Sequence, residues 1–133
     1  MKLTDAEWKV MDAVWTEASD GESVGSSVTA RSVLDRVRND TDWAYTTVKT
    51  IMSRLVDKGV LDARMRGNTS VYSPRVTREE SQRSEVEGVL DRAFGGTLAP
   101  FMHFLVSGRD LSDSEREALR RALDEHERSS REE

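Results

Sequence analysis

Hydroxyl and cationic side chains recur along one face of the segment from residue 43 to residue 59, and Asp57 is the first carboxylate on it. Such side chains can donate hydrogen bonds to phosphates and to base edges in a DNA major groove. Two more cations, Arg64 and Arg66, follow shortly after this segment. The residues assigned to DNA contact are Thr46, Thr47, Lys49, Thr50, Arg54, Arg64 and Arg66.

The opposite face of the same segment is apolar, with the i, i+3, i+4, i+7 spacing of a helical stripe at Val48, Ile51, Met52 and Leu55. Gly59 is placed to end this helix. Two short runs, 60–65 and 70–73, flank a turn signal at 66–69 and predict a two-stranded ribbon. We therefore expect a helix followed at once by a basic hairpin.

Two further helices are predicted upstream. Thr4 and Glu7 have the spacing of a capping box, which begins a helix expected over about residues 5–17. A polar stretch at 18–27 predicts a loop, and Thr29 is placed to cap the second helix. Three helices and a hairpin, in this order, are typical of a winged helix-turn-helix. The fold class expected is mostly α with a small β-ribbon.

After Pro74 the sequence predicts helices alone, over about 77–94, 98–106 and 112 onward, and Ser112 with Glu115 has the spacing of a capping box at the start of the last helix. A segment of under about 60 residues encloses little interior, so a second copy of the chain is expected to cover the apolar faces. The alternative is packing back onto the same chain. We expect residues 1–75 to bind DNA and residues 76–133 to dimerise. The predicted dimer residues are Val86, Val89, Leu90, Phe94, Phe101, Phe104, Leu105, Leu119 and Leu123.

The net charge of −5 is unevenly distributed along the chain. Residues 43–75 hold six cations against two acids, whereas residues 1–42 and 76–133 each hold more acids than cations. Charges interact with phosphates mainly within a Debye length, about 8 Å at physiological salt. The local surplus of cations is therefore compatible with a nucleic-acid partner.

Composition argues against several other classes of protein. The chain has no cysteine, which excludes thiolate metal sites and cysteine nucleophiles. Its two histidines, His103 and His126, fall in different predicted helices, so neither a metal nor a cofactor is expected. The acids are spread along helix faces without a nucleophile and base, so an enzyme is not expected. No apolar run approaches the roughly 20 residues that cross a bilayer, which favours a cytoplasmic protein without membrane insertion.

The combined pattern resembles the penicillinase-repressor family of winged-helix transcriptional repressors. The likeness lies at Leu3, Thr4, Glu7, Trp8, Met11, Trp15, Trp43, Thr47, Val48, Thr50, Arg54, Leu55, Lys58, Gly59, Tyr72, Pro74, Phe94, Gly95, Gly96, Leu111, Ser112 and Glu115. The resemblance implies a homodimer that represses transcription from palindromic operators in double-stranded DNA, often those of antibiotic-resistance or stress genes. It also implies that Thr47 and Lys49 contact bases, and that a membrane-bound sensor protease triggers cleavage of the repressor.

The sequence departs from the family pattern at two places. Ala44 and Tyr45 stand where the family often has Ser-Pro at the start of the third helix, which removes a capping hydroxyl worth about 1 kcal/mol. His103 and Phe104 stand where the family has the Asn-Phe pair at its cleavage site, and they are the candidate cleavage site here. The cysteine-rich tail of copper-responsive relatives is absent.

Two other functions fit part of the pattern. One is a winged helix used only for docking another protein, which predicts no salt-dependent DNA affinity. The other is a repressor induced by a small ligand, with Phe101, Met102 and Phe104 lining a pocket between the dimer helices.

Overall fold

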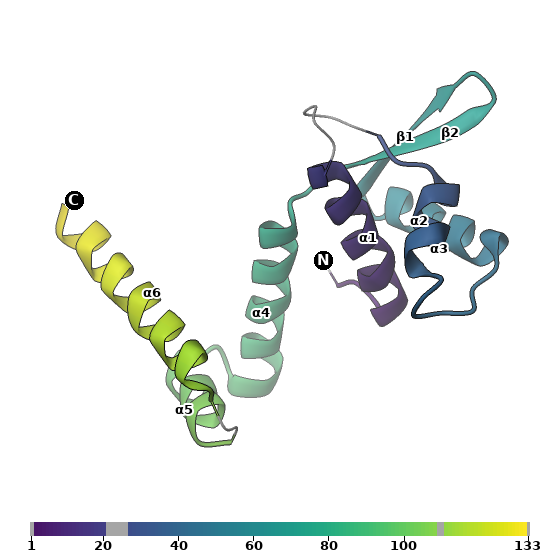
Figure 1. The fold of residues 1–133 in the computed structure, drawn as a ribbon. Coiled ribbons are helices and arrows are strands. Elements are labelled where there is room, and N and C mark those ends of the chain that lie inside the picture. Colours follow the sequence, from purple (N-terminus) through teal and green to yellow (C-terminus); the bar gives the residue numbers. More distant parts are fainter. Residues whose placement is uncertain (1, 21–26, 109–110, 133) are drawn as a thin grey trace. The chain divides into compact units, whose positions relative to one another are not determined.

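The computed structural model describes residues 2–20, 27–108 and 111–132. Its elements are α1 (Asp5–Asp20), α2 (Ala30–Val37), α3 (Tyr45–Asp57), β1 (Leu61–Arg66), β2 (Thr69–Pro74), α4 (Arg78–Phe94), α5 (Leu98–Gly108) and α6 (Asp113–Glu132) (Figure 1). The chain forms two compact units, residues 1–87 and 88–133.

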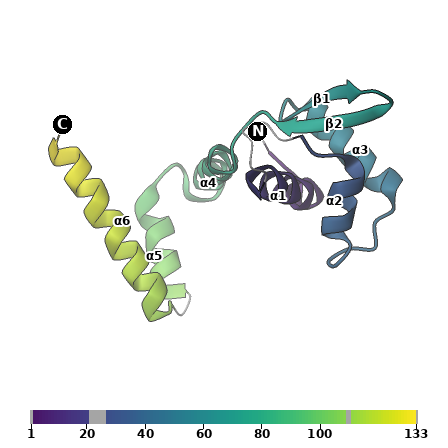
Figure 2. The ribbon, with the colours of Figure 1, turned by 45° about the horizontal axis from the view of Figure 1, so that its top comes forward.

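The first unit is a winged helix. Helices α1, α2 and α3 pack against one another, and the β1–β2 hairpin projects from them as the wing (Figures 1 and 2). The buried apolar side chains of the described residues all belong to this unit and include the predicted stripe of α3. They are Leu3, Val10, Met11, Ala13, Val14, Trp15, Val28, Ala30, Val33, Leu34, Val37, Val48, Ile51, Met52, Leu55, Val60, Leu61 and Tyr72.

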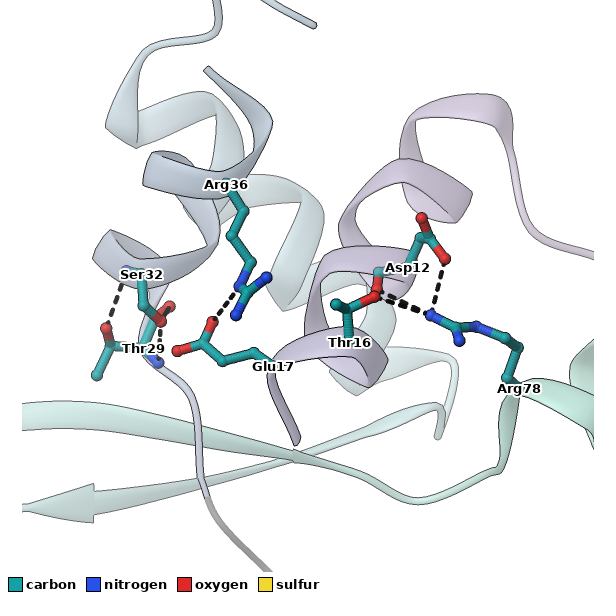
Figure 3. A network of polar contacts seen from close by, with 7 residues as sticks. All are labelled: Asp12, Thr16, Glu17, Thr29, Ser32, Arg36 and Arg78. Atoms are coloured by element: carbon teal, nitrogen blue, oxygen red, sulfur yellow. Dashed lines mark hydrogen bonds and ion pairs between the residues drawn. The ribbon is translucent and has the colours of Figure 1, made fainter. Parts of the chain in front are cut away.

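Side-chain caps begin the first two helices, as predicted. The Thr4 amide donates to Glu7 Oε1 at 2.9 Å, and the Glu7 amide donates to Thr4 Oγ1 at 3.2 Å. Thr29 caps α2 through a reciprocal pair of hydrogen bonds with Ser32, each 3.1 Å long (Figure 3). Helix α1 runs three residues beyond the predicted end at Glu17. Residues 21–26 of the predicted loop lie outside the described residues.

Gly59 ends α3 as predicted, in a left-handed conformation with φ of 78°. The Gly59 amide donates to the Val56 carbonyl and the Val60 amide to the Leu55 carbonyl, both at 3.0 Å. These two bonds form a Schellman motif, and the buried side chains of Leu55 and Val60 supply its apolar contact. The chain therefore leaves the helix directly into β1.

The wing is an antiparallel hairpin whose register pairs Arg66 with Thr69 and Ala63 with Tyr72. Gly67 is the first residue of the two-residue turn, and its φ of 64° is readily adopted only by glycine. Val28 forms an additional antiparallel bridge, because its amide and carbonyl both bond to Tyr72. The sequence pattern did not predict this third strand position.

The start of α4 is attached to the winged helix. The Trp15 indole N–H donates to the Val76 carbonyl at 3.0 Å. Arg78 donates to Asp12 Oδ1 at 2.9 Å and to the Thr16 hydroxyl at 3.0 Å (Figure 3). Residues 76–87 thus belong structurally with the first unit. The functional assignment of residues 1–75 and 76–133 stays a prediction.

The second unit contains the end of α4 with α5 and α6. Phe94 and Phe101 meet edge to face with ring centroids 5.3 Å apart. A reciprocal capping box of Ser112 and Glu115, with both bonds 3.1 Å long, begins α6 as predicted. None of the described side chains of this unit is buried. Within the described ranges, no helix is both long and apolar enough to cross a bilayer.

Candidate nucleic-acid interface

Helix α3 places its polar side chains on one exposed face. Val48, Ile51, Met52 and Leu55 are buried and fix the helix against α1 and α2. A shallow depression of about 410 Å³ along the polar face is lined in part by Thr47. The exposed face carries all five DNA-contact residues predicted on this helix, Thr46, Thr47, Lys49, Thr50 and Arg54.

One of these hydroxyls is already engaged within the helix. Thr50 Oγ1 donates to the Thr46 carbonyl at 2.9 Å. In this rotamer the Thr50 oxygen can accept a hydrogen bond from a base amino group, and its methyl group can contact an apolar base edge. It has no proton left to donate to a phosphate oxygen.

Two of the six cations between residues 43 and 75 are neutralised by neighbouring acids. Lys58 Nζ lies 2.6 Å from Glu7 Oε1, and Arg75 Nε lies 3.5 Å from Asp62 Oδ1. Across the described residues, no acid lies within ion-pair distance of the other four cations. These are Lys49, Arg54, Arg64 and Arg66.

The Lys58 contact also lowers the pKa of Glu7. Burial by itself raises this pKa, but the hydrogen bonds from Lys58 and Thr4 and the positive charge of Lys58 outweigh it. The carboxylate therefore stays ionised in the folded protein. Lys58 serves mainly to join α3 to the start of α1.

The wing arginines lie on one face of the hairpin. Arg64 and Arg66 are two residues apart on β1, so their side chains point to the same side. Tyr72, which is buried, pairs across the strands with Ala63 on the opposite side. Arg64 and Arg66 line a groove of about 320 Å³, together with Ser27 and residues of both strands of the wing.

The start of α3 shows a contact that the sequence did not reveal. Ala44 occupies the N-cap position, with no side-chain hydrogen bond. Tyr45 follows it, and the guanidinium carbon of Arg31 on α2 lies 5.1 Å from the centre of its ring. This distance is that of a cation–π contact. The tyrosine therefore links the second and third helices on their exposed side.

Comparison with known families identifies this arrangement. The family model described as penicillinase repressor matches residues 3–125. The chain belongs to the penicillinase-repressor family. The transcriptional regulator BlaI of Mycobacterium tuberculosis (strain CDC 1551 / Oshkosh) is 30% identical over 126 residues, which cover 93% of this chain and 84% of that protein.

Other family members are similar over comparable lengths. The penicillinase repressor of Bacillus licheniformis is 26% identical over 94% of this chain and 91% of that protein. The methicillin resistance regulatory protein MecI of Staphylococcus aureus (strain N315) is 23% identical over 92% of this chain and 93% of that protein. The solution structure of the DNA-binding domain of the repressor BlaI has a TM-score of 0.48 and 26% identity, covering 59% of this chain and 87% of that chain.

Penicillinase-repressor family members are transcriptional repressors, not enzymes. The family match confirms the resemblance seen in the sequence, and the three helices with a hairpin confirm the predicted fold class. Among the described residues, no group of three or more His, Asp or Glu side chains could hold a metal ion.

The side chains predicted to dimerise are exposed or half-buried in this family member. Phe104 and Leu123 are each 60% exposed, and Val86 and Leu119 are also exposed. The half-buried members of the set are Val89, Leu90, Phe94, Phe101 and Leu105.

The candidate cleavage site lies inside a helix. His103 and Phe104 are both exposed residues of α5, and the His103 carbonyl accepts a hydrogen bond from the Ser107 hydroxyl.

Of the three residues suggested for a ligand pocket, only Met102 lines the groove of about 370 Å³ between α5 and α6.

Proposed function

We propose that this chain is a sequence-specific transcriptional repressor that binds double-stranded operator DNA as a homodimer. The observation that carries the proposal is a set of four cations that, among the described residues, have no acid within ion-pair distance: Lys49 and Arg54 on α3 and Arg64 and Arg66 on the wing. The chain as a whole is acidic, with a net charge of −5. An exposed basic surface on a winged helix of this family fits the phosphate backbone of DNA.

In the proposed complex α3 enters the major groove. Thr47 and Lys49 contact base edges, and Thr50 adds an acceptor and a methyl group. Thr46 and Arg54 contact the groove wall or the backbone. Arg64 and Arg66 on the wing contact phosphates and add affinity without sequence preference.

Homodimerisation is proposed through the second unit, which includes the end of α4. The described part of that unit buries none of its side chains, although Phe104 and Leu123 are large and apolar. Exposed apolar surface of this kind is typical of an interaction site. A twofold-symmetric dimer covers both copies and presents two reading helices to a palindrome.

The names of the relatives suggest what is repressed. They include a penicillinase repressor and a methicillin resistance regulatory protein. We propose that the regulated genes belong to antibiotic resistance or stress responses, and that the protein acts in the cytoplasm, where its operator lies.

Release from the operator is proposed to follow cleavage between His103 and Phe104 after a membrane-bound sensor protease is activated. Because both residues lie inside α5, the helix must first open locally before a protease can bind the bond. The apolar groove lined by Met102, Leu105 and Leu119 favours a second mode of release, in which a small ligand binds there.

The test is binding of the purified protein to a duplex from the region upstream of its own gene, followed by fluorescence anisotropy at two salt concentrations. A scrambled duplex of the same length is the competitor. Tight, salt-dependent binding that prefers the upstream duplex and saturates at one dimer per site supports the proposal. If no salt-dependent binding to any duplex is seen, including fragments selected from the whole genome, the protein is a docking module instead.

A further inference from the structure

A second polar groove of the winged helix, with a volume of about 190 Å³, is formed by α2, the start of α3 and the hairpin turn. Arg31 reaches it from α2, and Tyr45 and Lys49 from α3. Asn68 and Thr69 line it from the turn. No carboxylate is among the described residues that line this groove, so its two cations face hydroxyl, amide and aromatic groups.

The position of Arg31 is fixed by an aromatic ring and not by an acid. Its guanidinium carbon lies 5.1 Å from the centre of the Tyr45 ring, and across the described residues no acid lies within ion-pair distance of it. A guanidinium held over a ring loses little further freedom when it binds a ligand, and its N–H groups stay available. Such a planar fork matches the oxygens of a phosphate.

We propose that this groove binds a phosphate of the operator backbone. Arg31 supplies the positive charge that pairs with the phosphate, the Asn68 amide and Thr69 hydroxyl add hydrogen-bond donors, and Tyr45 is a positioning residue that holds Arg31. The inference rests on the proposed function. The occupant is DNA because Lys49 also belongs to the exposed polar face of α3, so a strand seated here runs directly beside that face.

The proposal assigns a DNA contact to α2, outside the surface predicted from the sequence. A phosphate held between α2, α3 and the wing sets how far α3 is rotated in the major groove. It therefore fixes the register of Lys49 on the bases without reading any base itself.

The test compares Arg31→Ala with Arg38→Ala in the full-length protein. Arg38 is exposed, follows the same helix, pairs with Asp35 at 3.8 Å and does not line the groove. Anisotropy is measured on the upstream and scrambled duplexes over a range of salt concentrations. Removing the cation that neutralises one phosphate lowers the slope of log affinity against log salt by about one unit. We expect this change for Arg31→Ala on both duplexes and no change for Arg38→Ala.

Two tyrosine variants test the positioning role. Tyr45→Phe keeps the ring and should keep the slope of the unmodified protein. Tyr45→Ala should weaken binding several-fold, yet add little when Arg31 is already alanine, because the two residues act through one contact. If Tyr45→Ala weakens binding as much in the Arg31→Ala background as it does in the otherwise unmodified protein, Tyr45 acts independently of Arg31. That result would overturn the positioning role of Tyr45.

The outcomes separate this inference from the proposed function. An unchanged salt slope for Arg31→Ala, with a normal preference for the upstream duplex, overturns the phosphate site alone. A lowered slope for Arg31→Ala, when the unmodified protein prefers neither the upstream duplex nor any fragment selected from the whole genome, supports the phosphate site and overturns sequence-specific repression. Absence of binding to either duplex and to fragments selected from the whole genome overturns both. Circular dichroism of each variant checks that the exposed substitutions leave the fold intact.

Discussion

Lys58 Nζ lies 2.6 Å from Glu7 Oε1 and 3.1 Å from the Lys2 carbonyl oxygen, so the end of α3 is bound to the start of α1. Glu7 is 2% exposed, and the same oxygen also accepts from the Thr4 amide. One carboxylate therefore caps α1 and anchors the end of α3.

The Glu7→Gln variant is expected to lose about 2 kcal/mol of unfolding free energy near neutral pH, because it removes a charged acceptor from a largely buried pair. The pKa of Glu7 is lowered from 4.5 in the folded state, so its contribution is complete above 4.5 and is lost as the pH falls through the folded pKa. The difference between the variant and the unmodified protein should shrink in acid. Urea denaturation at several pH values measures it.

Asp62→Asn is the control for this experiment. It removes a carboxylate from the exposed pair with Arg75 and should change stability by less than about 0.5 kcal/mol at any pH. A Glu7→Gln effect of the same small size would contradict the anchoring role.

Lys49→Ala is expected to relax base preference at one operator position by about 1 to 3 kcal/mol, because it removes a side chain placed to contact a base edge. Lys9→Ala removes the same charge from the exposed side of α1 and is the control. Affinities are compared across a panel of single-base operator variants. If Lys49→Ala and Lys9→Ala show the same base preference, Lys49 contacts only the DNA backbone.

Arg64→Ala and Arg66→Ala are expected to weaken binding to all duplexes alike. Each should lower the salt slope by about one unit for every phosphate that the arginine neutralises. Arg75→Ala is the control, because Arg75 is paired with Asp62. The measurement is anisotropy on operator and scrambled DNA over a range of salt concentrations. If only the affinity for operator DNA falls, the wing contributes to sequence preference.

Truncation after Glu87 is expected to leave a folded monomer with much poorer operator affinity. The fragment ending at Pro74 should be less stable than the fragment ending at Glu87 by about 1 to 3 kcal/mol. It lacks Val76, whose carbonyl accepts the Trp15 hydrogen bond, and Arg78, which binds Asp12. Sedimentation and thermal melting compare the two fragments. A dimer formed by the fragment ending at Glu87 would contradict the proposal that the second unit holds the dimer interface.

Ala44→Ser is expected to stabilise the protein by about 1 kcal/mol, since Ala44 has the extended backbone of an N-cap but no side chain to accept a hydrogen bond. Ala44→Val tests whether the gain depends on the hydroxyl, and the midpoint of urea unfolding measures both. If both variants stabilise equally, capping is not the cause.

The local features of the fold were predictable from the sequence. The capping boxes of Thr4 with Glu7 and of Ser112 with Glu115 depend on residues three apart, which a sequence displays directly. The buried stripe of α3 and its end at Gly59 are equally local. The exposed face of α3 followed from the same periodicity.

Contacts between distant residues were not predictable in this way. Lys58 and Glu7 are 51 residues apart, and their pairing removes one cation from the basic surface that the sequence suggested. The cation–π contact of Arg31 with Tyr45 joins two helices, and the bridge of Val28 with Tyr72 joins a loop to the wing. Each depends on how the helices pack, which periodicity does not specify.

Since none of the described side chains beyond residue 87 is buried, that unit has no interior of its own. If two copies supply the interior together, folding and pairing become a single equilibrium governed by protein concentration. Operator occupancy then rises more steeply than in proportion to the number of chains in the cell. A modest fall in the number of chains would then leave the operator unoccupied. The acidic C-terminal half would thus make repression depend steeply on the concentration of the repressor itself.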